Sequence, residues 1–120
     1  MVLTAEGECE ALDSDMRALA FRCIRELLLN VATHAGTDRA SVSLRREETH
    51  LRVTVEDEGR GFDCEQLDAL DGDLHFGLIS IQERLSLVGG RFAIESAPGK
   101  GTRCLLAIPF SPSAKEDRSQ

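Results

Sequence analysis

The 120-residue chain contains no tryptophan and no tyrosine, and it has no run of basic residues. Without them, stacking of exposed bases on Trp or Tyr side chains is not available as a recognition mode. The 14 Lys and Arg residues are outnumbered by 21 Asp and Glu residues, and the resulting net charge of −7 argues against a nucleic-acid surface. If so acidic a protein binds a polyphosphate, a cation or backbone amides must offset the charge.

The four cysteines form no Cys-x-x-Cys pair, which argues against a zinc site and a disulfide framework. Cys23 lies in a helical apolar pattern and Cys104 in a strand pattern, so we expect both in or near the core. No apolar run approaches the roughly 20 residues of a membrane span, and no basic-then-apolar leader opens the chain. We therefore expect a cytoplasmic domain without membrane contact of its own, whose parent protein could be anchored in a membrane.

The sequence also lacks the common phosphate-binding loops. No Gly-x-Gly-x-x-Gly or Gly-x-x-x-x-Gly-Lys-Thr motif follows a strand and opens a helix. The tetrapeptide Gly-Lys-Gly-Thr at residues 99–102 leads into a strand instead. A doubly wound parallel sheet is therefore not expected.

The apolar spacing predicts two main helices. Apolar side chains recur at helical spacing in residues 16–34, with Asp13 or Ser14 as the N-cap and Gly36 at the end. A second helix is predicted over residues 78–88, closed by a pair of glycines. The acidic segment between the strand at residues 50–56 and this helix has no apolar period, so residues 63–76 are predicted to form a loop with a broken helical turn.

Five strands complete the prediction. They are expected at residues 1–6, 41–44, 50–56, 91–96 and 102–109, the last of them central in its sheet because it is apolar nearly throughout. Hairpin-like strand pairs lie beside helices without strict alternation. This predicts an α+β fold, a two-layer sandwich with helices on one face of a mixed sheet. One domain is expected over residues 1–110, followed by a disordered polar tail at 111–120.

A carboxylate and two glycines follow the strand that ends near residue 56. Asp57 can accept a hydrogen bond from an exocyclic amine, while Gly59 and Gly61 lack the Cβ atoms that would hold the backbone away from a flat ligand. The alternative interpretation is a tight turn between a strand and a loop. The motif alone does not decide between the two.

Three polar residues on the first predicted helix are spaced by four. Glu26, Asn30 and His34 form one slanting row beside the apolar stripe, at the edge of the core. The alternative is that this row is a solvated flank of the helix. That alternative explains the Asn less well, because Asn is only a modest helix former and gains nothing from exposure in the middle of a helix. An amide oxygen near a carboxylate suits Mg²⁺ that keeps waters and binds substrate phosphates. Such an ion would join an acidic protein to an anionic ligand.

Four segments together resemble the ATP-binding catalytic domain of sensor histidine kinases. Residues 25–35 (RELLLNVATHA) are similar to the asparagine box, and residues 57–62 (DEGRGF) to the first glycine box. Residues 75–90 resemble the second glycine region of the short-lid class, and residues 99–102 the closing Gly-x-Gly-Thr. The resemblance implies the Bergerat (GHKL) ATP-binding fold, shared with gyrase-type ATPases and a heat-shock chaperone, and a place in two-component signal transduction.

The resemblance also implies ATP and Mg²⁺ as cofactors and gives roles to individual residues. Asn30 corresponds to the Mg²⁺ ligand, Glu26 to the acid that orients water or supports catalysis, and Asp57 to the acid that reads the adenine amino group. The further nucleotide contacts it implies are His34, Gly59, Gly61, Gly77, Leu78 and Thr102.

The sequence departs from the family pattern at several positions. Thr33 stands where many members carry a Lys that touches phosphate, and His34 is a candidate replacement donor. Glu58 replaces the commoner Asn and adds negative charge. Gly77 is the one glycine evident in the second glycine region, which fits the short-lid class but leaves fewer amides for the phosphates.

The sequence contains no dimerisation helix with a phosphoacceptor histidine. His34, His50 and His75 all lie elsewhere in the predicted fold. We therefore expect a catalytic domain cut from a sensor kinase, which delivers the γ-phosphate to a histidine on a separate dimerisation domain, with a response regulator as a further partner. Two alternatives stay open, a stand-alone serine kinase of the anti-sigma-factor type and a non-catalytic nucleotide-binding module.

Overall fold

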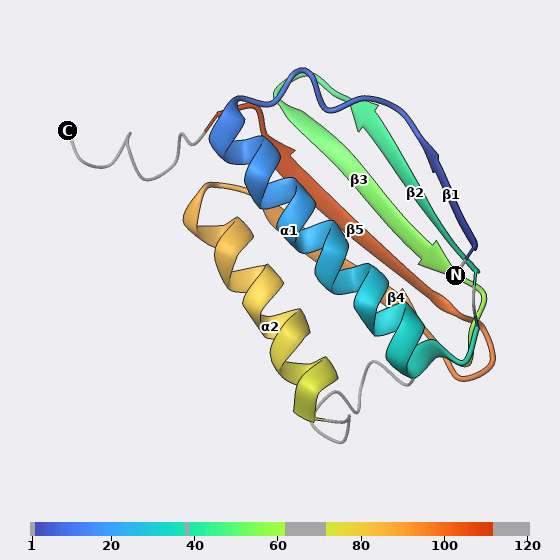
Figure 1. Cartoon of the computed structure of the whole chain (residues 1–120). Helices are drawn as coiled ribbons and strands as arrows, with labels where there is room; N and C mark the ends of the chain where they lie inside the picture. The colour runs from blue at the N-terminus through green and yellow to red at the C-terminus, as the bar shows by residue number, and fades with distance from the viewer. Residues whose placement is uncertain (1, 38, 62–71, 112–120) are drawn as a thin grey trace.

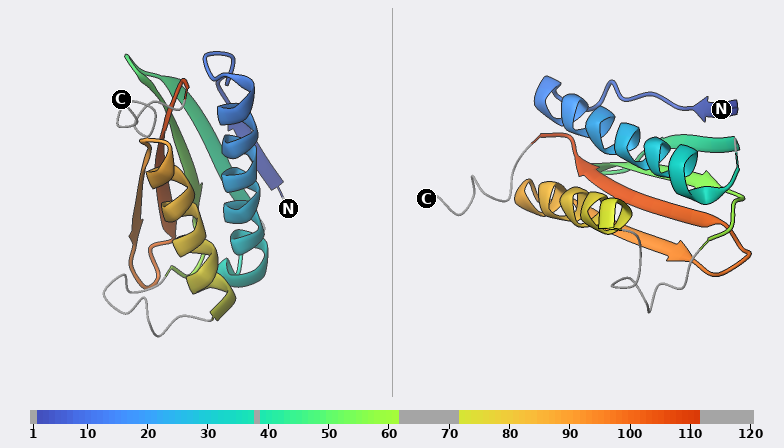
Figure 2. Two further views of the ribbon diagram at one scale, coloured as in Figure 1. Left: turned by 90° about the vertical axis from the view of Figure 1, so that its left-hand side faces the viewer. Right: turned by 60° about the horizontal axis from the view of Figure 1, so that its bottom comes forward.

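The computed structural model describes residues 2–37, 39–61 and 72–111 and shows a five-stranded sheet with helices over one face (Figure 1). Turned views show both long helices on the same side of the sheet (Figure 2). The predicted two-layer α+β sandwich is confirmed. In chain order the elements are β1 (Val2–Glu6), α1 (Ser14–Asn30), the π-helical turn η1 (Val31–Ala35), β2 (Arg39–Arg46), β3 (His50–Asp57), α2 (Gly72–Leu87), β4 (Arg91–Ser96) and β5 (Thr102–Pro109).

The strands are ordered β1-β2-β3-β5-β4, with β1 parallel to β2 and the other neighbours antiparallel. The sheet is therefore mixed, and β5 has a partner strand on each side, as its continuous apolar sequence predicts. Pairing of β3 with β5 sets Asp57 opposite Thr102. Two residues predicted to contact the nucleotide therefore meet at one end of the sheet.

The core lies between the helices and the sheet. On α1 the buried residues Met16, Ala20, Cys23 and Leu27 follow the predicted helical spacing. They belong to one cluster with apolar residues of α2, β2, β3 and β5 that includes Cys104. Both cysteines are therefore buried as predicted. Burial raises the pKa of the Cys23 thiol, against the opposing charges of Arg84 and Arg22, so this thiol is protonated and structural.

Asp13, and not the alternative Ser14, caps α1. Its carboxylate accepts a hydrogen bond from the backbone N–H of Met16 at 2.8 Å. The Asp13 backbone N–H also donates to the carbonyl oxygen of Phe110 at 2.8 Å. This second bond ties the start of α1 to the end of β5. At its other end the helix continues as η1 and stops at Gly36, whose φ of 73° suits glycine.

The predicted start of the second helix is wrong. The loop predicted over residues 63–76 falls partly outside the described residues, but Gly72–Phe76 is helical because α2 begins at Gly72. The prediction followed the apolar stripe, which begins at Leu78, a buried residue of the core. Gly77 therefore lies inside a helix.

Two further predictions concern the ends of the chain and membranes. Residues 112–120 of the predicted polar tail lie outside the described residues, so the tail and the domain limit at residue 110 stay predictions. No helix in the described part of the chain is long and apolar enough to cross a membrane.

Candidate functional site

A cavity of about 210 Å³ lies between the end of α1, η1, the start of the α2 stripe and the sheet. It is lined by the apolar or small residues Leu27, Val31, Ala35, Val55, Gly61, Leu78, Ile94 and Cys104, and by the polar residues Asn30, His34, Asp57, Arg60 and Thr102. A mainly apolar hollow with a few converging polar groups is typical of a small-ligand site. It brings together six of the nine predicted site residues.

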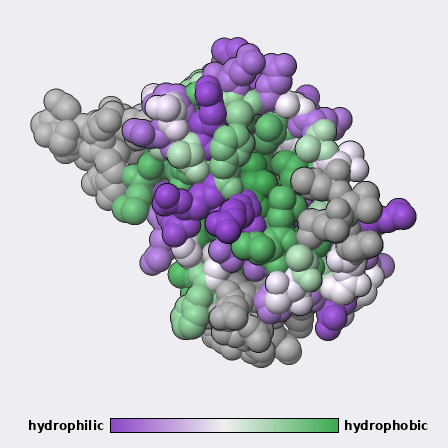
Figure 3. Space-filling view, viewed as in Figure 1, coloured by the Kyte–Doolittle hydropathy of each residue, from purple (hydrophilic) through white to green (hydrophobic). Residues whose placement is uncertain are grey.

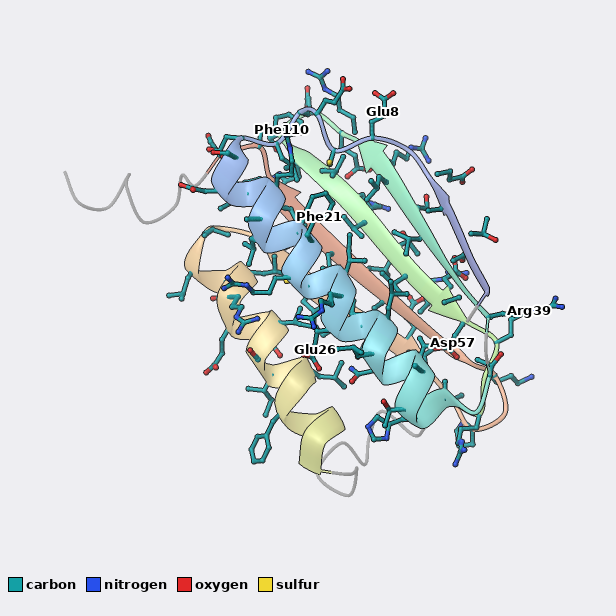
Figure 4. The ribbon with its side chains drawn as sticks, in the orientation of Figure 1. Glu8, Phe21, Glu26, Arg39, Asp57 and Phe110 are labelled. Atoms are coloured by element: carbon teal, nitrogen blue, oxygen red, sulfur yellow. The ribbon has the colours of Figure 1, made fainter. Side chains whose placement is uncertain are left out.

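Asp57 enters this cavity from the end of β3 (Figure 4). Its Oδ1 accepts a hydrogen bond from the backbone N–H of Gly59 at 2.8 Å. Burial raises the pKa of the Asp57 carboxyl above its ordinary value, and the backbone N–H groups of Gly59 and Thr102 partly oppose this shift. The ionised carboxylate therefore lacks part of the solvation it has in water. A ligand with an N–H donor would restore it.

Thr102 faces Asp57 across the β3–β5 pair and also lines the cavity. Its hydroxyl lies 3.0 Å from the hydroxyl oxygen of Ser96, which itself donates to the carbonyl oxygen of Gly101 at 2.8 Å. Ser96 thus holds the Thr102 hydroxyl in place next to the carboxylate. Nothing in the sequence motifs indicated Ser96, because its proximity depends on the pairing of β4 with β5.

Gly59 and Gly61 allow the backbone of this loop to pack closely against neighbouring backbone segments. This packing accounts for the two glycines better than close approach of a ligand does. A Cβ atom at Gly59 would collide with the carbonyl of Ala35 at the end of η1. A Cβ at Gly61, whose φ is 61°, would collide with the carbonyl of Ala97 and lie 2.8 Å from that of Gly101. Gly61 lines the cavity, but Gly59 does not. Both glycines let the loop after β3 touch its neighbouring segments.

Arg60 is a cavity residue that the sequence motifs did not single out. Its backbone N–H donates to Ala35 O at 2.7 Å, and its carbonyl accepts from the Gly99 N–H at 2.7 Å. Its guanidinium lies over Gly36, where a Cβ would be 3.0 Å from Nη2. The loop thus carries a held cation into the cavity of an acidic chain. A basic residue between the two glycines was the available signal.

Asn30 carries the one buried side-chain polar atom without a hydrogen-bond partner among the described residues, its Nδ2. Buried polar groups normally have partners, so this amide indicates a missing ligand. The following turn, η1, is π-helical, a distortion found frequently at functional sites. A π-helical turn holds more than four residues, so His34 lies slightly less than one full turn after Asn30. Both side chains line the cavity.

Glu26 and Gly77 are predicted site residues that do not line the cavity. Glu26 is half-buried between α1 and α2 (Figure 4). A Cβ added to Gly77 would lie 2.8 Å from its Oε2. The leucines that follow each of them, Leu27 and Leu78, do line the cavity. Glu26 and Gly77 therefore border the cavity without entering it.

The described residues contain no group of three His, Cys, Asp or Glu side chains that could hold a metal ion by themselves. The Asn30 side chain at the cavity fits Mg²⁺, which uses one or two protein oxygens and takes its other ligands from phosphates and water. The Asn30 amide can offer its oxygen or its nitrogen by rotation. The orphaned amide is thus compatible with a metal–nucleotide complex.

Comparison with known proteins identifies the family. A model of the family described as histidine kinase-, DNA gyrase B-, and HSP90-like ATPase matches residues 15–112. The chain belongs to this ATPase family. The match spans α1, the cavity and β5, so the resemblance that the four sequence motifs predict is confirmed.

Curated relatives of this ATPase domain include an uncharacterized sensor-like histidine kinase of Chloroflexus aurantiacus, 39% identical over 82% of this chain and 17% of that protein. Sensor histidine kinase YhcY of Bacillus subtilis is 34% identical over 92% of this chain and 28% of its own length. The ATPase domain therefore spans less than a third of these relatives.

Solved structures confirm the fold. The blue-light activated histidine kinase of Erythrobacter litoralis EL346 superposes with a TM-score of 0.64 at 24% identity, covering 95% of this chain and 36% of that one. The separate structure of its histidine kinase domain superposes with a TM-score of 0.60, covering 91% of this chain and 54% of that one. The arrangement of helices and sheet in the ATPase domain is thus that of histidine kinase catalytic domains.

Proposed function

We propose that the domain binds Mg·ATP in the cavity and delivers the γ-phosphate to a histidine on a separate dimerisation domain. The observation that carries this proposal is that one cavity is lined both by the partly buried carboxylate of Asp57 and by the Asn30 amide, whose Nδ2 has no hydrogen-bond partner. Asp57 would accept a hydrogen bond from the adenine amino group, with the Thr102 hydroxyl beside it and Gly61 at the edge of the base.

The polar residues near η1 suit the phosphates. His34 and Arg60 line the cavity there and offer N–H donors, while Thr33 is exposed. The Asn30 oxygen would hold Mg²⁺ together with phosphate oxygens, and the ion would supply positive charge against the transferred phosphoryl group. Glu26, one helical turn before Asn30, would orient the accepting nitrogen or water through its carboxylate.

The outer side of α2 offers a surface for the histidine-bearing domain. The helix face shows hydrophobic patches beside hydrophilic ones (Figure 3). On α2 the side chains of Phe76, Ile79 and Leu87 are 69%, 39% and 55% exposed, and the last two border a shallow groove. Apolar residues exposed along a helix that also borders the cavity suit docking of an acceptor helix. A response regulator and a cytoplasmic location, where ATP is supplied, complete the proposal.

The experiment is a transfer assay with radiolabelled ATP. The chain alone should form no acid-labile phosphohistidine, because a histidine must reach the γ-phosphate in line, whereas His34, His50 and His75 all belong to elements of the ATP-binding domain itself. Adding the histidine-bearing domain of a sensor histidine kinase relative in trans should give labelling. Ile79→Asp should slow that labelling at least tenfold without changing the nucleotide dissociation constant.

Phe21→Asp is the matched control, because Phe21 is 56% exposed on α1 and lies away from the α2 groove. It should leave labelling unchanged. Self-labelling of the bare chain on His34, His50 or His75 would contradict the need for a separate acceptor. Labelling of a serine on an anti-sigma-type partner, and of no histidine, would replace the proposal with a serine kinase.

A further inference from the structure

Glu26 of α1 lies against Gly77 of α2, where the two helices pack side by side. A Cβ built on Gly77 would lie 2.8 Å from Glu26 Oε2, 3.3 Å from its Cδ and 3.6 Å from its Cγ. All three of its nearest neighbours therefore belong to the Glu26 side chain. The bare Cα of Gly77 is what allows the Glu26 carboxylate to lie against α2.

The backbone gives no reason for glycine at this position. Gly77 lies inside α2 and is not among the glycines with positive φ. Within a helix, glycine is the poorest former after proline, and alanine is the best. A glycine that weakens its own helix therefore needs another role, and the contact with Glu26 is the one that the structure shows.

The contact lies next to the nucleotide cavity. Leu27 follows Glu26 and Leu78 follows Gly77, and both leucines line the cavity. Asn30 lies one turn beyond Glu26 on the same flank of α1. A carboxylate pushed off α2 would move relative to Asn30 and to any phosphate beside it.

We propose that Gly77 is a positioning residue that sets the Glu26 carboxylate for phosphoryl transfer. The proposal rests on the transfer function above. It gives Gly77 a role other than a phosphate-binding amide, because Gly77 acts through the side chain of Glu26. The end of a flexible side chain can give way, so a methyl group at residue 77 displaces the carboxylate and leaves the fold intact.

The test is Gly77→Ala in the whole chain, with the histidine-bearing domain in trans. The variant should unfold at the same temperature as the parent or a higher one, because alanine favours the helix. Its dissociation constant for Mg·ATP should stay within about twofold of the parent value, while the transfer rate at saturating ATP falls at least tenfold. This split separates positioning from nucleotide binding.

A double-mutant cycle makes the test specific. Glu26→Asp shortens the side chain and frees the space beside Gly77, so the Asp variant and the Asp/Ala double variant should transfer phosphate at rates within twofold of each other. An equal loss from Gly77→Ala in both backgrounds would overturn the proposal. So would parental transfer by Gly77→Ala, or a loss of Mg·ATP affinity as large as the loss of rate.

A second readout needs no transfer. The side-chain carboxyl carbon of Glu26, assigned in NMR spectra by its absence in Glu26→Gln, should shift in Gly77→Ala in the nucleotide-free domain. An unmoved resonance would overturn the positioning role. If the parent transfers no phosphate, the proposed function fails, and this resonance still decides whether Gly77 sets the carboxylate.

Discussion

Asn30→Ala should abolish the tightening of ATP binding by Mg²⁺ while sparing most of the metal-free binding of ADP. The variant removes the one amide oxygen that the cavity offers to the ion, and the described residues provide no cluster of other ligands to replace it. Calorimetric titration with ATP, with and without Mg²⁺, measures the effect. The parent should bind Mg·ATP more tightly than ATP alone, and the alanine variant should bind the two equally.

Asn30→Asp is the matched comparison, because it keeps an oxygen ligand and adds a negative charge. It should retain part of the Mg²⁺ dependence. Thermal unfolding without ligand is the control for folding, and Asn30→Ala should not lower it, since Nδ2 is buried without a partner. If both variants bind Mg·ATP like the parent, the row Glu26, Asn30 and His34 is only a solvated helix flank.

Asp57→Asn should weaken ATP binding by about 1–3 kcal/mol, because it leaves a partly buried polar contact mispaired. This corresponds to roughly 5- to 150-fold in the dissociation constant. The parent should strongly prefer ATP to GTP. The adenine amino group donates a hydrogen bond to the carboxylate, whereas guanine has a carbonyl oxygen at the same position. The variant should lose this preference. Equal affinities of the parent for ATP and GTP, measured by calorimetry, would rule out the adenine-reading role.

The pH dependence follows from the same carboxyl. Because burial raises the pKa of Asp57, the folded domain takes up this proton at a higher pH than an ordinary Asp would. ATP binding by the parent should therefore weaken as pH falls through that raised pKa. The same group affects folding with the opposite sign, since its contribution to stability is lost as pH rises through this pKa. Asp57→Asn, which cannot titrate, separates these effects from protonation of adenine itself.

Much of the fold could be predicted because local patterns agree with it. The apolar spacing of α1 and the alternation along β3 show which face of each element is buried. The cap at Asp13 likewise depends only on residues next to it in the sequence. The resemblance to the kinase family implied that Asp57 and Thr102 both contact the nucleotide, and the register of β3 and β5 brings them together. Such features need little knowledge of what lies across the core.

The features that were missed depend on contacts between distant segments. The π-helical turn η1 and the packing of Gly59 against Ala35 arise where the end of the first helix meets the loop after β3. Gly77 was expected near phosphates, but its bare Cα faces Glu26 on another helix. Arg60 is brought to the cavity by its bonds to Ala35 and Gly99. Residue spacing within one helix or strand cannot predict such contacts, because the partners lie in other segments of the chain.

NMR titration of the domain with Mg²⁺ and a non-hydrolysable ATP analogue tests whether this cavity is the Mg·ATP site. We expect the largest shifts at the Asn30 side-chain amide, which gains a partner, and at the backbone amides of Gly61 and Thr102. Arg45 and Arg91 on the outer face of the sheet should stay unmoved. Shifts centred on that face, with an unchanged Asn30 amide at saturation, would show that Mg·ATP does not bind in this cavity.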